Sequence, residues 1–94
     1  ALRFAVAVDP EGTRTIRVRV PGARRVALMA DFTDWIAVPL LPTGDGSDWV
    51  LSVFIAPGVH RVNVRIDDGP WIVPPGLTAV RDEFGGASGL LVVQ

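Results

Sequence analysis

The three tryptophans carry the most informative chemistry in this sequence. Trp35 ends the polar corner "DFTDW", and Trp71 ends a second corner, "DDGPW". An indole at a chain reversal either covers the core or stacks on a ligand, because its ring is largely apolar and its N–H is polar. Periodicity alone balances these two readings evenly. Trp49 differs, since it is in register with Leu51 and Val53, and this alternation predicts a place in the core.

Residue types for catalysis or metal binding are sparse. His60 is the only histidine and cysteine is absent, so a triad would need His60 to meet one of the scattered serines by accident of folding. Paired carboxylates suit glycosidases and calcium sites, but here each pair lies in a predicted turn, where aspartate bonds local backbone amides. The pairs are Asp31 with Asp34, Asp45 with Asp48, Asp67 with Asp68, and Asp82 with Glu83. We therefore expect no enzyme, no metal site and no cofactor.

Composition limits the partners and the size of the protein. The 94 residues suit one domain spanning 1–94, and 49% of them are hydrophobic, enough for a core. The nine basic residues are scattered arginines and the net charge is −1, which disfavours nucleic acid. Apolar runs are too short to insert into a membrane. Because the chain begins with Ala1, we expect it to be part of a longer protein. The lack of cysteine does not decide the cellular compartment, and we favour the cytoplasm.

Alternation at period two dominates the chain. Turns rich in Pro and Gly, such as "DPEG", "PGA", "APG" and "DDGP", separate the alternating runs. This pattern predicts an all-β fold, an immunoglobulin-like β-sandwich of seven to eight short, mostly antiparallel strands, with a small barrel as the alternative. The residues predicted to face inward are Leu2, Phe4, Val6 and Val8; Ile16, Val18 and Val20; Val26, Leu28 and Ala30; Trp49, Leu51, Val53 and Ile55; and Val62, Val64 and Ile66.

The structure of the remaining segments is predicted from the positions of the Pro- and Gly-rich turns around them. The first two strands are expected to form a hairpin, and "AVPLL" is a short apolar piece. "WIV" reads as a short strand, "PPGLTAVRDEFGGASG" as a long irregular loop and "LLVV" as the closing strand. In "HRVNVRI", Arg61, Asn63 and Arg65 are predicted to share the outward face of one strand.

Three segments together resemble a known family. "VALMADFTDW", "DWVLSVFIAPGVHRVNVRIDDGPW" and "DEFGGASGLLVV" are similar to the glycogen-binding module of the AMP-activated protein kinase β subunit. They also resemble the starch-binding modules that precede the catalytic domains of isoamylases and branching enzymes, grouped as carbohydrate-binding module family 48. The resemblance covers residues from about 20 to 94 and rests on the order of the motifs, since each motif alone is weak.

The resemblance implies a module that binds α-1,4-glucan such as glycogen or starch without cleaving it. Two tryptophans cradle the sugar in such modules, and they correspond to Trp35 and Trp71. Asn63 corresponds to the side chain that bonds sugar hydroxyls, while the late loop supplies an apolar prop at Phe84 and a polar contact at Ser88. Our reading of the residues adds Arg61 and Arg65, which would line a groove floor beside Asn63 and bond hydroxyls.

A second class of function stays open from the sequence. The chain is also consistent with a protein-interaction or spacer domain that keeps the fold but has a degenerate sugar site. In that case the exposed aromatic residues would contact an attached or partner domain. Two tryptophans set at an angle suit a curved α-glucan better than a flat β-glucan, which favours the sugar-binding hypothesis.

Overall fold

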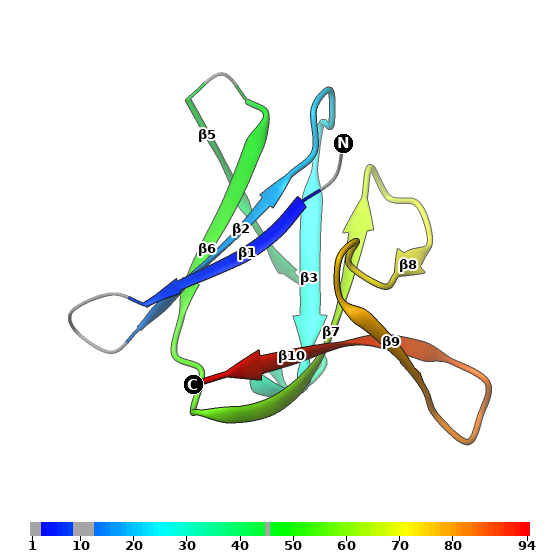
Figure 1. The fold of residues 1–94 in the computed structure, drawn as a ribbon. Helices are drawn as coiled ribbons and strands as arrows, with labels where there is room; N and C mark the ends of the chain where they lie inside the picture. Colours follow the sequence, from blue (N-terminus) through cyan, green and yellow to red (C-terminus); the bar gives the residue numbers. More distant parts are fainter. Residues whose placement is uncertain (1–2, 9–12, 45) are drawn as a thin grey trace.

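Period-two alternation builds two antiparallel sheets that pack face to face as a β-sandwich (Figure 1). The computed structural model describes residues 3–8, 13–44 and 46–94. The described strands are β1 (Arg3–Val8), β2 (Arg14–Arg19), β3 (Val26–Ala30), β4 (Val38–Pro39), β5 (Leu41–Thr43), β6 (Asp48–Val53), β7 (Gly58–Ile66), β8 (Trp71–Ile72), β9 (Thr78–Arg81) and β10 (Ala87–Val93). A single 3-10 turn, η1 (Asp31–Thr33), follows β3 within this part of the chain. The predicted β-sandwich is confirmed, and the barrel alternative is wrong.

The two sheets differ in size and in their role around the site. The smaller sheet has the order β1-β2-β6-β5, and its first two strands form the predicted hairpin. The larger sheet has the order β4-β3-β7-β10-β9, with β8 paired to β7 as well. The long central strand β7 therefore has β3 along one edge and both β8 and β10 along the other.

The core lies between the sheets and follows the predicted alternation. Buried side chains come from β2 and β6 on one side and from β3, β7 and β10 on the other. They include Ile16, Val18, Val20, Val26, Leu28, Ala30, Trp49, Ile55, Val62 and Val64, while Leu51, Val53 and Ile66 pack partly buried against them. Trp49 is only 6% exposed, so the prediction that it is a core residue is confirmed.

The strand count differs from the prediction because three short strands lie in segments that the alternation pattern does not reveal. Thr78–Arg81 forms β9 inside the stretch predicted as an irregular loop, and it pairs with β10. The apolar piece "AVPLL" forms parts of β4 and β5, which belong to different sheets. Leu40 lies buried between them, and its N–H donates to the Val26 carbonyl at 2.9 Å. The chain therefore crosses from one sheet to the other at Leu40.

Part of the first predicted hairpin lies outside the described residues. The turn "DPEG" is residues 9–12, which the structure does not describe. The inward face predicted for Leu2, Phe4, Val6 and Val8 lies outside the description in the same way. The backbone register of β1 and β2 is described, and it pairs Phe4 with Val18.

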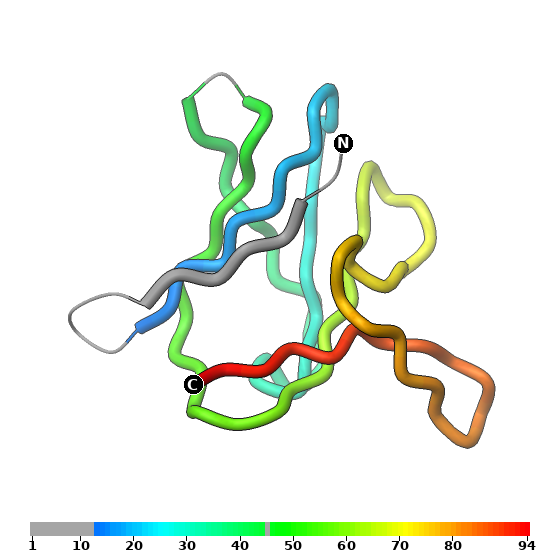
Figure 2. Tube along the Cα trace, viewed as in Figure 1, coloured from blue at the N-terminus to red at the C-terminus, as the bar shows by residue number. Residues whose placement is uncertain are grey.

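Arg14 ties the C-terminal end of the chain to the sandwich. Its buried guanidinium donates from Nε to the Ile55 carbonyl at 3.0 Å and from an Nη atom to the Gln94 carbonyl at 3.1 Å. Figure 2 shows the end of β10 lying beside the connection from β6 to β7, and Arg14 donates to both segments. These two hydrogen bonds offset part of the cost of burying the cation.

Candidate functional site

Both corner tryptophans line one groove on the outer face of the larger sheet. The groove has a volume of about 490 Å³. Strands β3, β7 and β10 supply its floor, and the corner after β3, the start of β8 and the hairpin between β9 and β10 supply its sides. The lining residues are Met29, Trp35, Arg61, Asn63, Trp71, Asp82, Gly86, Ala87 and Ser88.

Trp35 lies in a turn that is unfavourable for a bulky residue. Asp34 and Trp35 have φ angles of 54° and 59°, and the Ile36 N–H donates to the Thr33 carbonyl at 3.0 Å. Positive φ at both central residues is the pattern of a type I′ turn, in which the second central position favours glycine. Tryptophan there costs on the order of 1 kcal/mol or more. The indole is nevertheless held there with 43% of its surface exposed.

Hydrogen bonds at the base of the corner hold this strained turn in place. The Trp35 N–H donates to the Ala30 carbonyl at 2.9 Å, and the Thr33 hydroxyl accepts from the Ala30 N–H at 3.0 Å. The Asp31 carboxylate reaches β7, where its Oδ1 lies 3.0 Å from His60 Nδ1 and its Oδ2 accepts from the Arg61 N–H at 3.3 Å. These contacts fix the position of Trp35 relative to the groove floor.

Both ring nitrogens of His60 make hydrogen bonds that hold this corner. Its Nε2 lies 2.7 Å from the Ala56 carbonyl oxygen, which only accepts, so Nε2 donates in that contact. The Phe32 ring lies edge-on to the imidazole, with the centroids 5.6 Å apart. The only histidine of the chain therefore links β7 to the corner that carries Trp35.

Trp71 follows a second corner with two consecutive positive φ angles. Asp67 and Asp68 have φ angles of 51° and 60°, and the Gly69 N–H donates to the Ile66 carbonyl at 2.9 Å. These are the angles of a type I′ turn, and aspartate tolerates them better than most residues. The loop joins β7 to β8 and places the half-buried Trp71 beside the groove.

The Asp67 carboxylate ties this corner to the loop before β3. Its Oδ1 accepts from the backbone N–H groups of Arg24 at 2.6 Å and of Arg25 at 2.9 Å. The backbone N–H of Arg25, then that of Arg24, lowers the pKa of Asp67 below its ordinary value of 3.8. These bonds favour the charged carboxylate, so they favour the folded state wherever that carboxylate is ionised.

Replacing Asp67 with Asn is expected to lower stability at neutral pH and to have less effect in strong acid. The folded-state pKa lies below the unfolded one, so the stabilisation is complete above about pH 4 and is lost as the pH falls through the folded value. Urea denaturation of both proteins at about pH 6 and about pH 2.5 measures this difference. Asp34→Asn, a change of an exposed aspartate in the other corner, is the control. A stability difference for Asp67→Asn that is the same at both pH values would contradict the account.

Asn63 lies in the groove floor but is not an exposed side chain, which corrects the prediction for this strand. It is 5% exposed, and its Nδ2 donates to the carbonyls of Ala87 at 2.8 Å and Ile72 at 3.3 Å. Its Oδ1 accepts from the Ser88 hydroxyl at 2.9 Å. Alternation correctly predicts its face of the sheet, but the amide is hydrogen-bonded to β8 and β10, the strands along one edge of β7. Asn63 thus ties β7 to β8 and β10, and both Nδ2 hydrogens are used.

Arg61 and Ser88 remain as polar groups that a ligand in the groove can reach. Arg61 is exposed, and its guanidinium has no hydrogen-bond partner among the described residues. The Ser88 hydroxyl donates to Asn63 and keeps its oxygen lone pairs for an incoming donor. Both residues were predicted from the sequence as members of the site.

Two other predicted residues lie outside the groove lining. Arg65 turns instead toward Trp71, with its guanidinium carbon 5.9 Å from the ring centroid, and donates to the Asp68 carbonyl at 3.0 Å. It supports the tryptophan by a cation–π contact rather than lining the floor, which is a correction. Phe84 is 87% exposed at the tip of the hairpin between β9 and β10, so it does not contact the groove floor.

The groove contains residues that the sequence reasoning missed. Met29 occupies an outward position of β3, opposite Asn63, so alternation was a sufficient signal for it. Asp82 was read only as a turn residue, and Gly86 and Ala87 as part of a loop. Their place in the groove depends on β9, which the pattern did not predict. The sequence pattern therefore did not reveal the position of the hairpin between β9 and β10.

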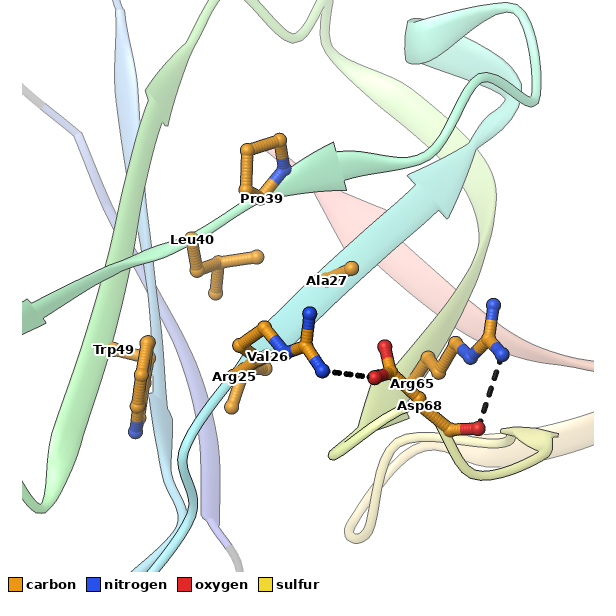
Figure 3. Close-up of a pocket in the computed structure, with 8 residues that line it drawn as sticks. All are labelled: Arg25, Val26, Ala27, Pro39, Leu40, Trp49, Arg65 and Asp68. Atoms are coloured by element: carbon orange, nitrogen blue, oxygen red, sulfur yellow. Dashed lines mark hydrogen bonds and ion pairs between the residues drawn. The ribbon is translucent and has the colours of Figure 1, made fainter.

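A smaller cleft lies at the side of the sandwich, with a volume of about 130 Å³ (Figure 3). Trp49 and Leu40 lie on one side of the view, and Arg25 and Arg65 reach Asp68 on the other. Its charged groups are thus engaged with each other, whereas its remaining walls are mostly apolar. The larger groove, with two indoles and unpaired polar groups, is the better candidate site.

The described residues hold no group of three or more His, Cys, Asp or Glu side chains that could bind a metal ion. No helix among them is long and apolar enough to cross a membrane. No family model and no curated protein matches the chain.

Proposed function

We propose that this chain is a non-catalytic module that binds α-1,4-glucan of the glycogen or starch type in the groove between Trp35 and Trp71. The observation that carries the proposal is the meeting of two indoles, presented by separate corners, in one groove with polar groups between them. An attached or partner protein would be targeted to the polysaccharide or regulated by it.

The chemistry of a glucose unit matches this set of groups. Each ring has an apolar C–H face that packs on an indole and a rim of hydroxyls that both donate and accept hydrogen bonds. In the groove, Trp35 and Trp71 offer the apolar faces, Arg61 offers donors and the Ser88 oxygen offers an acceptor. Asn63 supports the floor, because its amide is already hydrogen-bonded within the protein.

The backbone strain at Trp35 supports a role for this ring outside the core. A turn that favours glycine holds a large aromatic residue, and the ring leaves 43% of its surface in solvent. Neither feature stabilises the fold, and strained backbone of this kind clusters at binding sites. A ligand that covers the indole would gain the apolar area that the fold leaves exposed.

The placement of the two tryptophans favours a curved glucan. Trp35 lies in the corner that follows β3, and Trp71 begins β8, so the elements that carry them flank opposite edges of β7. Two rings on either side of a central strand favour a cradle over a flat platform. An α-1,4-linked chain curves and presents successive rings at changing tilt, whereas a β-1,4-linked chain is flat.

Isothermal titration with maltoheptaose, and with cellohexaose for comparison, tests the proposal. We expect maltoheptaose to bind with a Kd on the order of micromolar to millimolar, because the site is shallow, and cellohexaose to bind at least about tenfold more weakly. Absence of binding by the folded protein at millimolar maltoheptaose would overturn the proposal. Equal binding of both sugars would overturn the preference for α-glucan.

The exposed apolar residues favour a second candidate function, docking on an attached or partner protein. Phe84 is almost fully exposed, and Val59 and Val92 form an exposed cross-strand pair on β7 and β10. Under this alternative, replacing both Trp35 and Trp71 with Ala would weaken association with the partner chain and leave retention on immobilised glycogen unchanged. Loss of glycogen retention in that variant would favour glucan binding.

A further inference from the structure

The groove contains a carboxylate whose position is set by the hairpin between β9 and β10. Asp82 directly follows β9 and lines the groove together with Gly86 and Ala87 from the other side of the hairpin. Its backbone N–H donates to the Gly86 carbonyl at 2.9 Å. The backbone that carries the Asp82 carboxylate is therefore held in place by a hydrogen bond across the hairpin.

The two carboxylate oxygens of Asp82 have different surroundings. Oδ1 accepts from the backbone N–H groups of Phe84 at 2.9 Å and Gly86 at 2.8 Å, which organises the loop. Oδ2 has no hydrogen-bond partner among the described residues. A Cβ atom placed on Gly86 would lie 2.9 Å from Oδ2, so this oxygen lies directly over the glycine that lines the groove. Glycine at position 86 leaves Oδ2 uncovered.

The charged groups that line the groove, Arg61 and Asp82, match the hydrogen-bonding needs of a polyol. Arg61 contributes a cation from β7, and no ion pair joins it to Asp82 or to any other described carboxylate. A guanidinium only donates hydrogen bonds and an ionised carboxylate only accepts them. Adjacent hydroxyls of an uncharged sugar can do both, so one ring can satisfy the two groups at once. Hydrogen bonds to charged groups are the stronger ones in such a site.

We propose that Asp82 is a specificity-determining residue of the groove, whose Oδ2 accepts hydrogen bonds from the hydroxyls of a glucose unit stacked on the tryptophans. This inference rests on the proposed glucan-binding function and adds a ligand-contacting group to it. The carboxylate selects ligands that bring hydroxyl donors, and it disfavours a sugar acid that would bring a second negative charge to the same place.

Asp82→Asn is the informative variant, because its carbonyl oxygen still accepts from the Phe84 and Gly86 amides while an NH₂ group replaces Oδ2. Titration with maltoheptaose is expected to give about a tenfold weaker Kd. Glu83→Gln removes the neighbouring exposed acid, which does not line the groove, and is expected to change the Kd less than twofold. Unchanged amide chemical shifts of Phe84 and Gly86 would show that the loop of Asp82→Asn is intact.

Gly86→Ala tests the same oxygen without changing charge, since its methyl group would crowd Oδ2. Weaker binding by both Asp82→Asn and Gly86→Ala, with Glu83→Gln unaffected, supports the proposal. Wild-type affinity in both variants, with binding lost in a Trp35 variant, overturns the role of Asp82 and leaves glucan binding intact. Absence of maltoheptaose binding by the wild-type protein overturns both proposals.

Discussion

Replacing Trp35 with glycine is expected to weaken maltoheptaose binding strongly while the free energy of unfolding stays within about 1 kcal/mol of the wild type. The indole is one wall of the groove, so its removal should weaken binding at least about tenfold. Glycine is at ease at the φ of 59° found at this position, and the strain relieved offsets the packing lost from the half-covered ring. Titration calorimetry and urea denaturation measure the two effects separately.

Trp35→Ala is the matched control, because it removes the same ring and keeps a side chain at positive φ. We expect equal loss of binding in both variants and a free energy of unfolding about 1 kcal/mol lower for alanine than for glycine. Wild-type affinity in Trp35→Gly would remove this indole from the site. Equal stability of the two variants would show that the turn stores no strain.

Replacing Asn63 with Ala is expected to lower the free energy of unfolding by about 2–4 kcal/mol. The change leaves the carbonyls of Ile72 and Ala87 without this donor, opens a cavity at a buried position and removes the side-chain link between β7 and strands β8 and β10. Sugar binding should weaken as well, because Trp71 begins β8 and Ser88 belongs to β10. Urea denaturation followed by sugar titration of the folded variant measures both quantities.

Ser88→Ala isolates one part of this network, since it removes the hydrogen bond to Asn63 Oδ1 and keeps both Nδ2 bonds of Asn63. It should cost about 1 kcal/mol of stability and a smaller share of the affinity. A different result for Asn63→Ala, wild-type stability combined with lost affinity, would assign Asn63 a direct contact with the sugar instead of a structural role.

The buried layers of the sandwich were predictable because apolar side chains recur at every second position of the long strands. Ile16, Val18, Leu28 and Val64 obey the period-two rule, and all four are buried. The rule failed where pairing is decided by distant segments. Thr78–Arg81 lies between Gly and Pro residues and carries no clear alternation, yet it pairs with β10. The short strands around Leu40 contain prolines and belong to two sheets, which no local pattern reveals.

The site was predictable at its corners and less so between them. The sequence marks Trp35 and Trp71 because each ends a polar corner, and both rings line the same groove. Alternation places Asn63 and Arg65 on the outer face but says nothing of what covers that face. In the structure the Asn63 amide bonds to carbonyls of β8 and β10, and the Arg65 guanidinium lies near Trp71 and donates to the Asp68 carbonyl. Whether a residue on the outer face is buried depends on segments that come later in the chain, such as β8 and β10. A periodic pattern within one strand gives no information about them.

The central claim is that the groove between Trp35 and Trp71 binds α-glucan, and the indole N–H signals of the three tryptophans test it most directly. In a ¹⁵N–¹H spectrum recorded during a maltoheptaose titration, we expect the Trp35 and Trp71 signals to shift together and to saturate. Trp49 is buried between the sheets, so its signal should stay in place and serves as an internal control. Unmoved Trp35 and Trp71 signals at millimolar sugar, or equal shifts of all three, would contradict the account.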